Sequence, residues 1–332
     1  MVPPPRIVLA GVASVAVALA GCGGGGSTKT TSTSAGLPAS TTPQPFPSGR
    51  GQTLSSLRAK MPRGPILAPS TTASLESGSN RIAFALRDSA NKEIAGAPVA
   101  IYVFNHDGGG GRGPFMAKPE SIAVPPPYLS KTAASDLQTA SSLYVANGVR
   151  LNQGKQVVTG VARLDGRLVA TTGFELPIPP PRSKDRPPDV GQRAIPIDNP
   201  TVADAHGDLS KIETRIPPAP ALLRDKVSSL IGRKPFVLVF ATPLLCQSRT
   251  CGPVVDVAVD VQAKYGKRVA FVHQEIYRQN QVAKGFTKQV GQWRLPTEPW
   301  TFVVDRRGRI ASRFEGALSV GELSAAVAKV AR

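Results

Sequence analysis

Residues 177–220 constrain the fold of this chain more than any other segment. The stretch is polar and rich in proline, and it includes the runs Pro179-Pro180-Pro181 and Pro187-Pro188. Proline removes a backbone donor, and a composition of this kind buries too little apolar surface to fold by itself. We therefore expect an extended linker over 177–220 that packs partly on its neighbours and separates two folded units.

The length and the composition agree with such a division. A chain of 332 residues exceeds a typical single domain, so two folded units with additional tails are expected. The hydrophobic fraction of 41% supports ordinary cores, whereas 32 prolines and 32 glycines are more than those cores need. A good share of the chain should therefore be linker.

The net charge of +18 raises the question of an anionic partner. Binding to nucleic acid needs basic residues clustered with stacking aromatic side chains. Here lysine and arginine are spread along the chain, and aromatic residues make up only 5% of it. The sequence therefore argues against nucleic acid and favours a basic surface beside anionic lipid.

The first 21 residues have the pattern of a signal peptide. One positive charge, at Arg6, precedes an unbroken run of apolar or small residues over 7–20. This run suits the core of a signal peptide and is short for a membrane span, which needs roughly 20 apolar residues. It ends in Leu19-Ala20-Gly21-Cys22, which resembles the lipobox of bacterial lipoproteins.

The lipobox resemblance implies that Cys22 carries a diacyl lipid and becomes the mature N-terminus. We then expect the chain to be anchored to the extracytoplasmic face of the bacterial cell membrane, because two acyl chains hold a protein durably on a bilayer. Residues 22–69, which begin with a glycine run and a Ser/Thr/Pro-rich stretch, are expected to form a flexible tether. An ordinary cleaved signal with an incidental cysteine is the alternative.

Residues 70–176 have the pattern of an all-β unit. Asp165-Gly166 between two strand-like runs is a strong hairpin signal. Several short strands with Gly/Pro turns predict an immunoglobulin-like sandwich. The glycine-rich run 106–113 lacks the ending of a phosphate-binding loop, so we expect a plain loop there and a spacer or docking module overall. The clearest strands are expected at 81–86, 99–104, 157–164 and 167–172.

Residues 221–332 alternate between helix and strand. The run 236–240 is continuously apolar, as buried parallel strands are. A helix is expected over 253–265 with Asp256 and Asp260 on its polar side, and Ser319 with Glu322 predicts a capping box for the last helix. Further strands are expected at 268–273, 301–305 and 309–314.

This order, β-α-β followed by β-β-α, resembles the thioredoxin fold from about residue 226 to the end. Cys251-Gly252-Pro253 opens the first helix, like the start of the family's Cys-Gly-Pro-Cys, and Pro299 precedes a strand where thioredoxins carry a cis-proline. The resemblance implies that Cys251 is the nucleophile and that Pro299 lies beside it. The chain departs from the family at Val254, which replaces the second cysteine, while Cys246 lies five residues upstream of Cys251.

The two cysteines also point to redox chemistry without the resemblance. If Cys22 is lipidated, the remaining pair lies outside the reducing cytoplasm and predicts a disulfide or a redox dithiol. A helix N-terminus favours the thiolate of Cys251, and Arg249 would add positive potential. A loop can bring Cys246 within disulfide range, which requires Cα atoms closer than about 7 Å. Trp300 is expected either in the wall of a substrate groove or in the core.

The resulting prediction is thiol–disulfide exchange with a protein dithiol or disulfide, without a cofactor. Cys251 would attack, Cys246 would resolve the mixed disulfide, and Pro299 would shape the groove. A static disulfide is the alternative, although closing so small a ring stabilises a fold little.

Two further functions stay open. Thr242 and the two cysteines resemble peroxiredoxins in which four residues separate the pair, so that Cys246 would be oxidised and Cys251 would resolve it. The threonine spacing is one residue too long for that family. Sco-type copper chaperones hold copper with two cysteines and a distant histidine, here His273, but their cysteines lie one residue closer together. A His273 hydrogen-bonded beside Glu275 is the alternative to a copper ligand.

Overall fold

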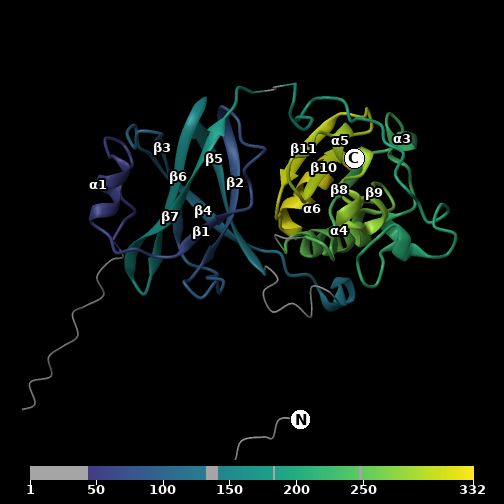
Figure 1. Ribbon diagram of the computed structural model, residues 1–332, viewed down its shortest axis with the longest axis horizontal. Helices are drawn as coiled ribbons and strands as arrows, with labels where there is room; N and C mark the ends of the chain where they lie inside the picture. Colours follow the sequence, from purple (N-terminus) through teal and green to yellow (C-terminus); the bar gives the residue numbers. More distant parts are fainter. Residues whose placement is uncertain (1–43, 132–140, 182–183, 247–248) are drawn as a thin grey trace, which may run out of the picture. The chain divides into compact units, whose positions relative to one another are not determined.

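The computed structural model describes residues 44–131, 141–181, 184–246 and 249–332 (Figure 1). The described residues belong to one compact unit. Cys22 and the predicted signal peptide lie outside the described residues. Within them, no helix is both long and apolar enough to cross a membrane.

The N-terminal half is built around a β-sheet, as predicted (Figure 1). Seven antiparallel strands form one sheet in the order β1-β2-β5-β4-β3-β6-β7. The predicted hairpin is present between β6 and β7, where Asp165 and Gly166 both adopt positive φ. The strands are β1 (Ile66–Pro69), β2 (Gly78–Arg87), β3 (Val99–Asn105), β4 (Arg112–Ser121), β5 (Ser142–Leu151), β6 (Gly154–Leu164) and β7 (Arg167–Ile178).

Hydrogen bonding joins all seven strands, so the two separate sheets of the predicted sandwich are replaced by one barrel-like sheet. Register shifts interrupt the pairing of β2 with β5, β3 with β4 and β6 with β7, and such bulges bend strands. The bending brings the first strand to the last, where Leu67 N donates to Thr172 Oγ1 at 3.0 Å. Phe84, Val103 and Tyr144 are buried in the core of this half.

The flexible tether predicted for 22–69 is wrong for its last part. Residues Leu54–Ala59 form helix α1, whose N-cap Thr53 accepts a hydrogen bond from Ser56 N. Strand β1 follows and pairs with β2. Leu57 and Leu67 are both 3% exposed, so two apolar side chains fix this segment to the sheet.

The C-terminal half has the predicted order of elements around a four-stranded sheet, β11-β10-β8-β9 (Figure 1). β8 and β9 are parallel, and β10 is antiparallel to both of its neighbours. The strands are β8 (Phe236–Phe240), β9 (Ala270–Gln274), β10 (Trp300–Val304) and β11 (Ile310–Glu315). The helices are α3 (Val227–Leu230), α4 (Cys251–Tyr265), α5 (Lys288–Gln292) and α6 (Val320–Val330).

Strand β8 is buried on both faces, which explains its continuous apolar run. Val237 and Val239 face one core with residues of α4 and α6, which lie side by side, and the alternate residues of β8 face the other (Figure 1). The predicted capping box of α6 is confirmed, since Ser319 Oγ accepts from Glu322 N at 3.1 Å and Glu322 Oε2 accepts from Ser319 N at 3.1 Å.

The proline-rich segment packs more closely than an extended linker would. Strand β7 continues to Ile178, and later in the segment Ala194 and Ile197 enter the core beside β8. The apolar residues of 222–231 have helical spacing, but of these residues only Val227–Leu230 form an α-helix, α3. Short 3₁₀ turns occur at η1 (Pro126–Tyr128), η2 (Leu209–Lys211), η3 (Pro220–Leu222), η4 (Arg278–Asn280) and η5 (Val282–Lys284).

Candidate functional site

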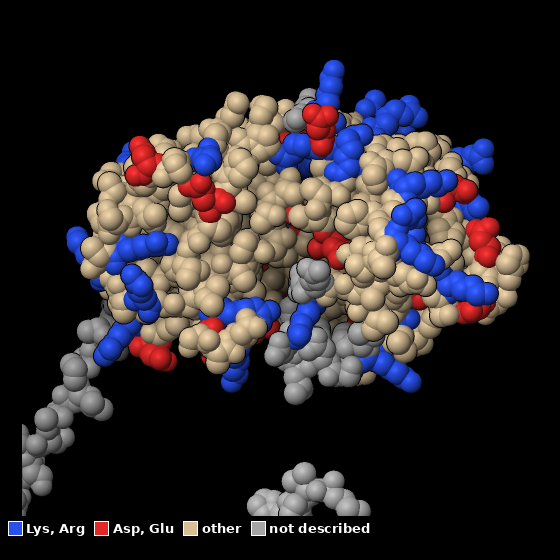
Figure 2. All heavy atoms as spheres, in the orientation of Figure 1, with Lys and Arg blue, Asp and Glu red and all other residues tan. Residues whose placement is uncertain are grey.

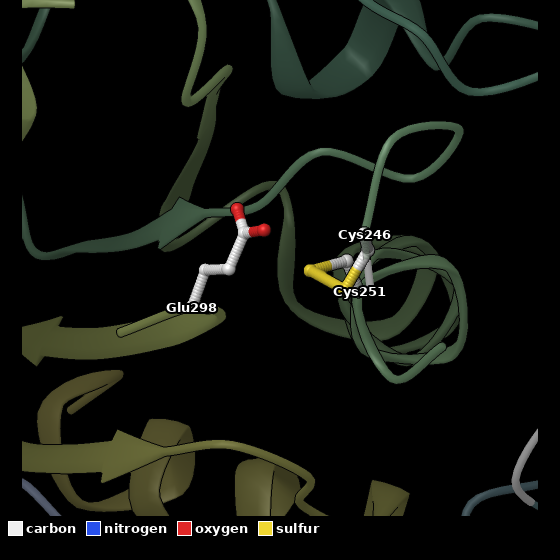
Figure 3. Close-up of side chains that lie close together, drawn as sticks. All are labelled: Cys246, Cys251 and Glu298. Carbon is white, nitrogen blue, oxygen red and sulfur yellow. A yellow bond between two sulfur atoms is a disulfide. The ribbon is translucent and has the colours of Figure 1, made fainter. Parts of the chain in front are cut away.

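A disulfide joins Cys246 and Cys251 at the start of α4 (Figure 3). The loop after β8 carries Cys246, and α4 begins at Cys251, so the two Cα atoms are 6.0 Å apart. This confirms that the two cysteines lie within bonding distance. Helix α4 begins two residues earlier than predicted. Cys251 therefore lies in its first turn, where the backbone amides have no partner within the helix.

The two sulfur-bearing residues differ in exposure. Cys251 is 0% exposed, whereas Cys246 is half-buried. A partner thiol approaching from water therefore reaches Cys246 first. This arrangement reverses the accessibility that the predicted roles require, because the expected attacking residue, Cys251, is the buried one.

Glu298 belongs to the candidate site although the sequence patterns do not point to it. Its carboxylate and the two sulfur atoms all lie within 4.8 Å of one another. Figure 3 shows the Glu298 side chain extending from the segment before β10 toward the disulfide. Its position could have indicated this, because Glu298 directly precedes Pro299, which was predicted to lie beside Cys251.

The surroundings of Glu298 keep its carboxyl partly protonated at neutral pH. Burial, together with the nearby Glu275, raises the pKa of Glu298 to about 7. Its Oε2 atom is buried and has no hydrogen-bond partner among the described residues. A carboxyl in this state can both donate and accept a proton.

The remaining predicted site residues fall into different environments. The Glu298–Pro299 peptide bond is cis, and Pro299 follows Glu298 into the start of β10. Trp300 is 0% exposed and stacks on Phe302, so the predicted groove-wall role is wrong and the side chain belongs to the core. Arg249 is exposed and has a φ of 57°, in the loop that leads into α4.

His273 lies in a buried polar network apart from the disulfide. Its Nδ1 is 2.9 Å from Glu213 Oε1 and its Nε2 is 3.1 Å from Ala241 O. Both partners can accept, so the arrangement favours an imidazolium, which donates from both ring nitrogens. Burial opposes this charge, but the bond to Glu213 and the charges of Glu213 and Glu275 raise the pKa of His273.

The copper site considered from the sequence is therefore not assembled. Among the described residues, the donors that converge with the two sulfurs come from Glu298, and His273 is not one of them. The alternative, a hydrogen-bonded His273 near Glu275, is confirmed, and the partner of its Nδ1 is Glu213 of the proline-rich segment. Glu275 instead accepts hydrogen bonds from Thr214 N and Thr214 Oγ1, and burial raises its pKa.

Two hollows meet at Glu298. One, of about 340 Å³, is lined by Thr250 next to Cys251 and by Glu315 of β11. The other has a volume of about 410 Å³, and Phe286, which is 63% exposed, stacks on Tyr277 in its wall. Glu298 lines both hollows, so one side chain lies between the sulfurs and two hollows in the surface.

Lysine and arginine side chains are scattered over the face of the molecule shown in Figure 2. They occur over both halves of that face, with acidic side chains between them. The spread of basic residues along the sequence thus reappears on this face.

Comparisons with known proteins found no matching family model and no matching curated protein. A search of solved structures found a thiol:disulfide interchange protein of the thioredoxin family from Chlorobium tepidum TLS, with 16% identity over 42% of this chain and 100% of that one, at a TM-score of 0.27. CopC from Methylosinus trichosporium OB3b shares 13% identity over 36% of this chain and 97% of that one, at a TM-score of 0.20.

A third solved structure is the fibronectin type-III domain of human fibronectin type III domain containing protein 3. It shares 15% identity over 37% of this chain and 92% of that one, at a TM-score of 0.19. TM-scores and identities of this size do not establish a family.

Proposed function

We propose that this chain is an extracytoplasmic, thioredoxin-like protein that exchanges its Cys246–Cys251 disulfide with protein dithiols. One observation carries the proposal: a disulfide has its buried sulfur in the first turn of a helix and its other sulfur toward the surface. The helix N-terminus stabilises a thiolate at Cys251, which makes that sulfur a good leaving group. The order of strands and helices and the positions of Cys251 and Pro299 support the thioredoxin-like assignment.

The burial of the two cysteines assigns their roles in exchange. A partner thiolate attacks Cys246 Sγ, the bond between Cys246 and Cys251 breaks, and Cys251 leaves as a thiolate. The second thiolate of the partner then attacks the partner sulfur of the mixed disulfide and releases Cys246. The partner dithiol becomes a disulfide, the cysteine pair becomes a dithiol, and the same steps run in reverse when the partner supplies a disulfide.

The reduction potential of the pair, with two serine variants, tests this function. A potential between about −120 and −270 mV is typical of working oxidoreductases, and one below about −300 mV indicates a structural bond. We expect Cys251→Ser to accumulate a mixed disulfide with a reducible protein such as insulin, through Cys246. Cys246→Ser should not accumulate it, because the remaining thiol is buried. A structural potential together with no mixed disulfide would refute the proposal.

A thiol peroxidase is the second candidate, because the half-buried position of Cys246 leaves it open to a small oxidant. The peroxide would oxidise Cys246 to a sulfenic acid with release of water, and Cys251 would then form the disulfide with loss of a second water. Peroxide consumption that is lost in Cys246→Ser and exceeds insulin reduction would favour this candidate over exchange.

We also propose that Cys22 anchors the chain by a lipid and that the β half is an immunoglobulin-like spacer or docking module. The strand order supports the second part, because joining the immunoglobulin sheets A-B-E-D and C-F-G at one edge gives the order found here. Labelling with a radioactive fatty acid tests the anchor. We expect Cys22→Ser to lose both the label and membrane sedimentation, and an unchanged distribution would exclude lipidation at that residue.

A further inference from the structure

The Cys251 sulfur needs a proton that water cannot supply directly. Cys251 is 0% exposed, and it changes between a disulfide and a thiol in every cycle of the proposed exchange. Burial disfavours a lasting charge on this sulfur, so the thiolate released when the disulfide opens takes up a proton and loses it again when the disulfide closes. The carboxyl of Glu298 lies within 4.8 Å of both sulfurs.

We propose that Glu298 is the acid–base group of the disulfide, which protonates the departing Cys251 thiolate and takes the proton back when the bond reforms. The inference rests on the proposed exchange function and adds to it the route of the proton. In Figure 3 the Glu298 side chain extends toward the pair.

Glu298 lies between the buried Cys251 sulfur and two hollows of the surface. Its Oε2 is buried without a hydrogen-bond partner, so no described group holds the lone pairs of that atom. The residue itself is only half-buried and lines hollows of about 340 and 410 Å³. A proton can therefore pass from solvent in either hollow to the carboxyl and from the carboxyl to sulfur.

The other titratable groups around Glu298 are less suited to this task. Glu315, across the smaller hollow, is held by hydrogen bonds from residues 72–74 and from Thr297, and the Arg87 side chain in the same hollow has donors but no acceptor. Burial and the charge of Glu298 raise the pKa of the Tyr277 phenol, so it stays protonated at neutral pH. Glu275 is 4% exposed and has little contact with solvent. Burial of Glu298 and, to a smaller extent, the charge of Glu275 raise the pKa of Glu298 to about 7. Both forms of its carboxyl are therefore populated near neutral pH.

The proton balance of one reduction step follows from this arrangement. The partner thiolate forms a bond to Cys246 Sγ, and the electron pair of the broken disulfide bond goes to Cys251 Sγ. The Glu298 carboxyl gives its proton to Cys251 Sγ and becomes a carboxylate. Water in the adjoining hollows then returns a proton to Glu298.

Reduction of the full chain by dithiothreitol at pH 5–9 tests the inference, with each rate divided by the thiolate fraction of the reagent. We expect the corrected wild-type rate to fall as the pH rises through about 7, where Glu298 loses its proton. At pH 6, the corrected rate of reduction of Glu298→Gln should be about 100-fold lower than that of the wild type, which is the lower end of the range for general acid catalysis. The corrected rate of this variant should not vary with pH. Glu298→Asp should retain a pH dependence, and Glu175→Gln, an exposed control in the β half, should match the wild type.

An unchanged pH profile in a folded Glu298→Gln variant would overturn the inference. If that variant does not fold, the pH dependence of the rate at which iodoacetamide alkylates the reduced wild type decides the question. A rate profile without an inflection near pH 7 would equally overturn the role of Glu298. Dithiothreitol separates the two proposals because it needs no protein partner. If the pH profile of reduction by dithiothreitol depends on Glu298 but the chain does not exchange with protein dithiols, only the proposed function is refuted. If Glu298→Gln exchanges with protein dithiols as fast as the wild type, only the acid–base role is refuted.

Discussion

Arg215 Nε donates a hydrogen bond of 2.8 Å to Asp256 Oδ1, and the side chains are only 4% and 1% exposed. The other carboxylate oxygen of Asp256 accepts from Ser130 N and Ser130 Oγ. Arg215 also donates to the carbonyl oxygens of Pro217 and Tyr128. This buried pair thus connects α4, the proline-rich segment and the chain that follows β4.

Replacing Asp256 by asparagine should destabilise the protein strongly. The change leaves the Arg215 guanidinium buried without its counter-charge, which typically costs about 3–5 kcal/mol. Urea unfolding of the full chain measures the loss, and Asp260→Asn, on the same helix and half-buried, should change the free energy of unfolding by less than about 0.5 kcal/mol. Equal effects of the two substitutions would show that the ion pair is not what holds these segments.

Replacing His273 by glutamine should remove a pH-dependent part of the stability. The pKa of His273 is raised in the folded protein, so the native state binds its proton more tightly than the unfolded state does. Its contribution is therefore complete below the unfolded pKa of about 6.5 and is lost as the pH rises through the higher folded value. Urea unfolding at pH 6 and pH 9 should show a smaller loss of stability with rising pH in His273→Gln than in the wild type, and identical losses would contradict the buried imidazolium.

Glu315 holds the loop before β2 to the segment before Pro299. Its carboxylate accepts from the backbone amides of Thr72, Ala73 and Ser74 and from the hydroxyls of Thr72 and Thr297. Hydrogen bonds to a charged group are worth about 1.5–3 kcal/mol each. Glu315→Gln turns one acceptor oxygen into a donor facing donors, so hydrogen exchange at residues 72–74 should accelerate by at least about tenfold. Glu175→Gln, at an exposed pair, should leave that exchange unchanged.

Local patterns in the sequence predicted the local structures well. The apolar run of β8, the Asp165-Gly166 turn and the Ser319/Glu322 capping box each depend on residues within a few positions of one another. The proximity of Cys246 and Cys251 was predictable for the same reason, because five positions limit how far two Cα atoms can separate.

Contacts between distant segments could not be predicted in this way. Asp256 was expected on the polar side of α4, but it is buried by Arg215, 41 positions away, and by Ser130, 126 positions away. His273 pairs with Glu213, which lies 60 positions earlier in a segment that looked like a linker. The continuous sheet of the β half depends on bulges that bend the strands, and no residue type marks those bulges.

The pKa of Glu298 predicts how stability changes with pH near neutrality. A buried carboxyl whose pKa is raised from 4.5 to about 7 holds its proton in the folded chain at pH values where the unfolded chain has already lost it. The native state then binds more protons, so the contribution of Glu298 to stability falls as the pH rises from about 4.5 through about 7. Glu298→Gln cannot ionise, and it should lose less stability than the oxidised wild type between pH 5 and pH 8. Urea unfolding of both proteins with the disulfide intact measures this, and parallel curves would mean that Glu298 titrates in the folded chain as it does in water.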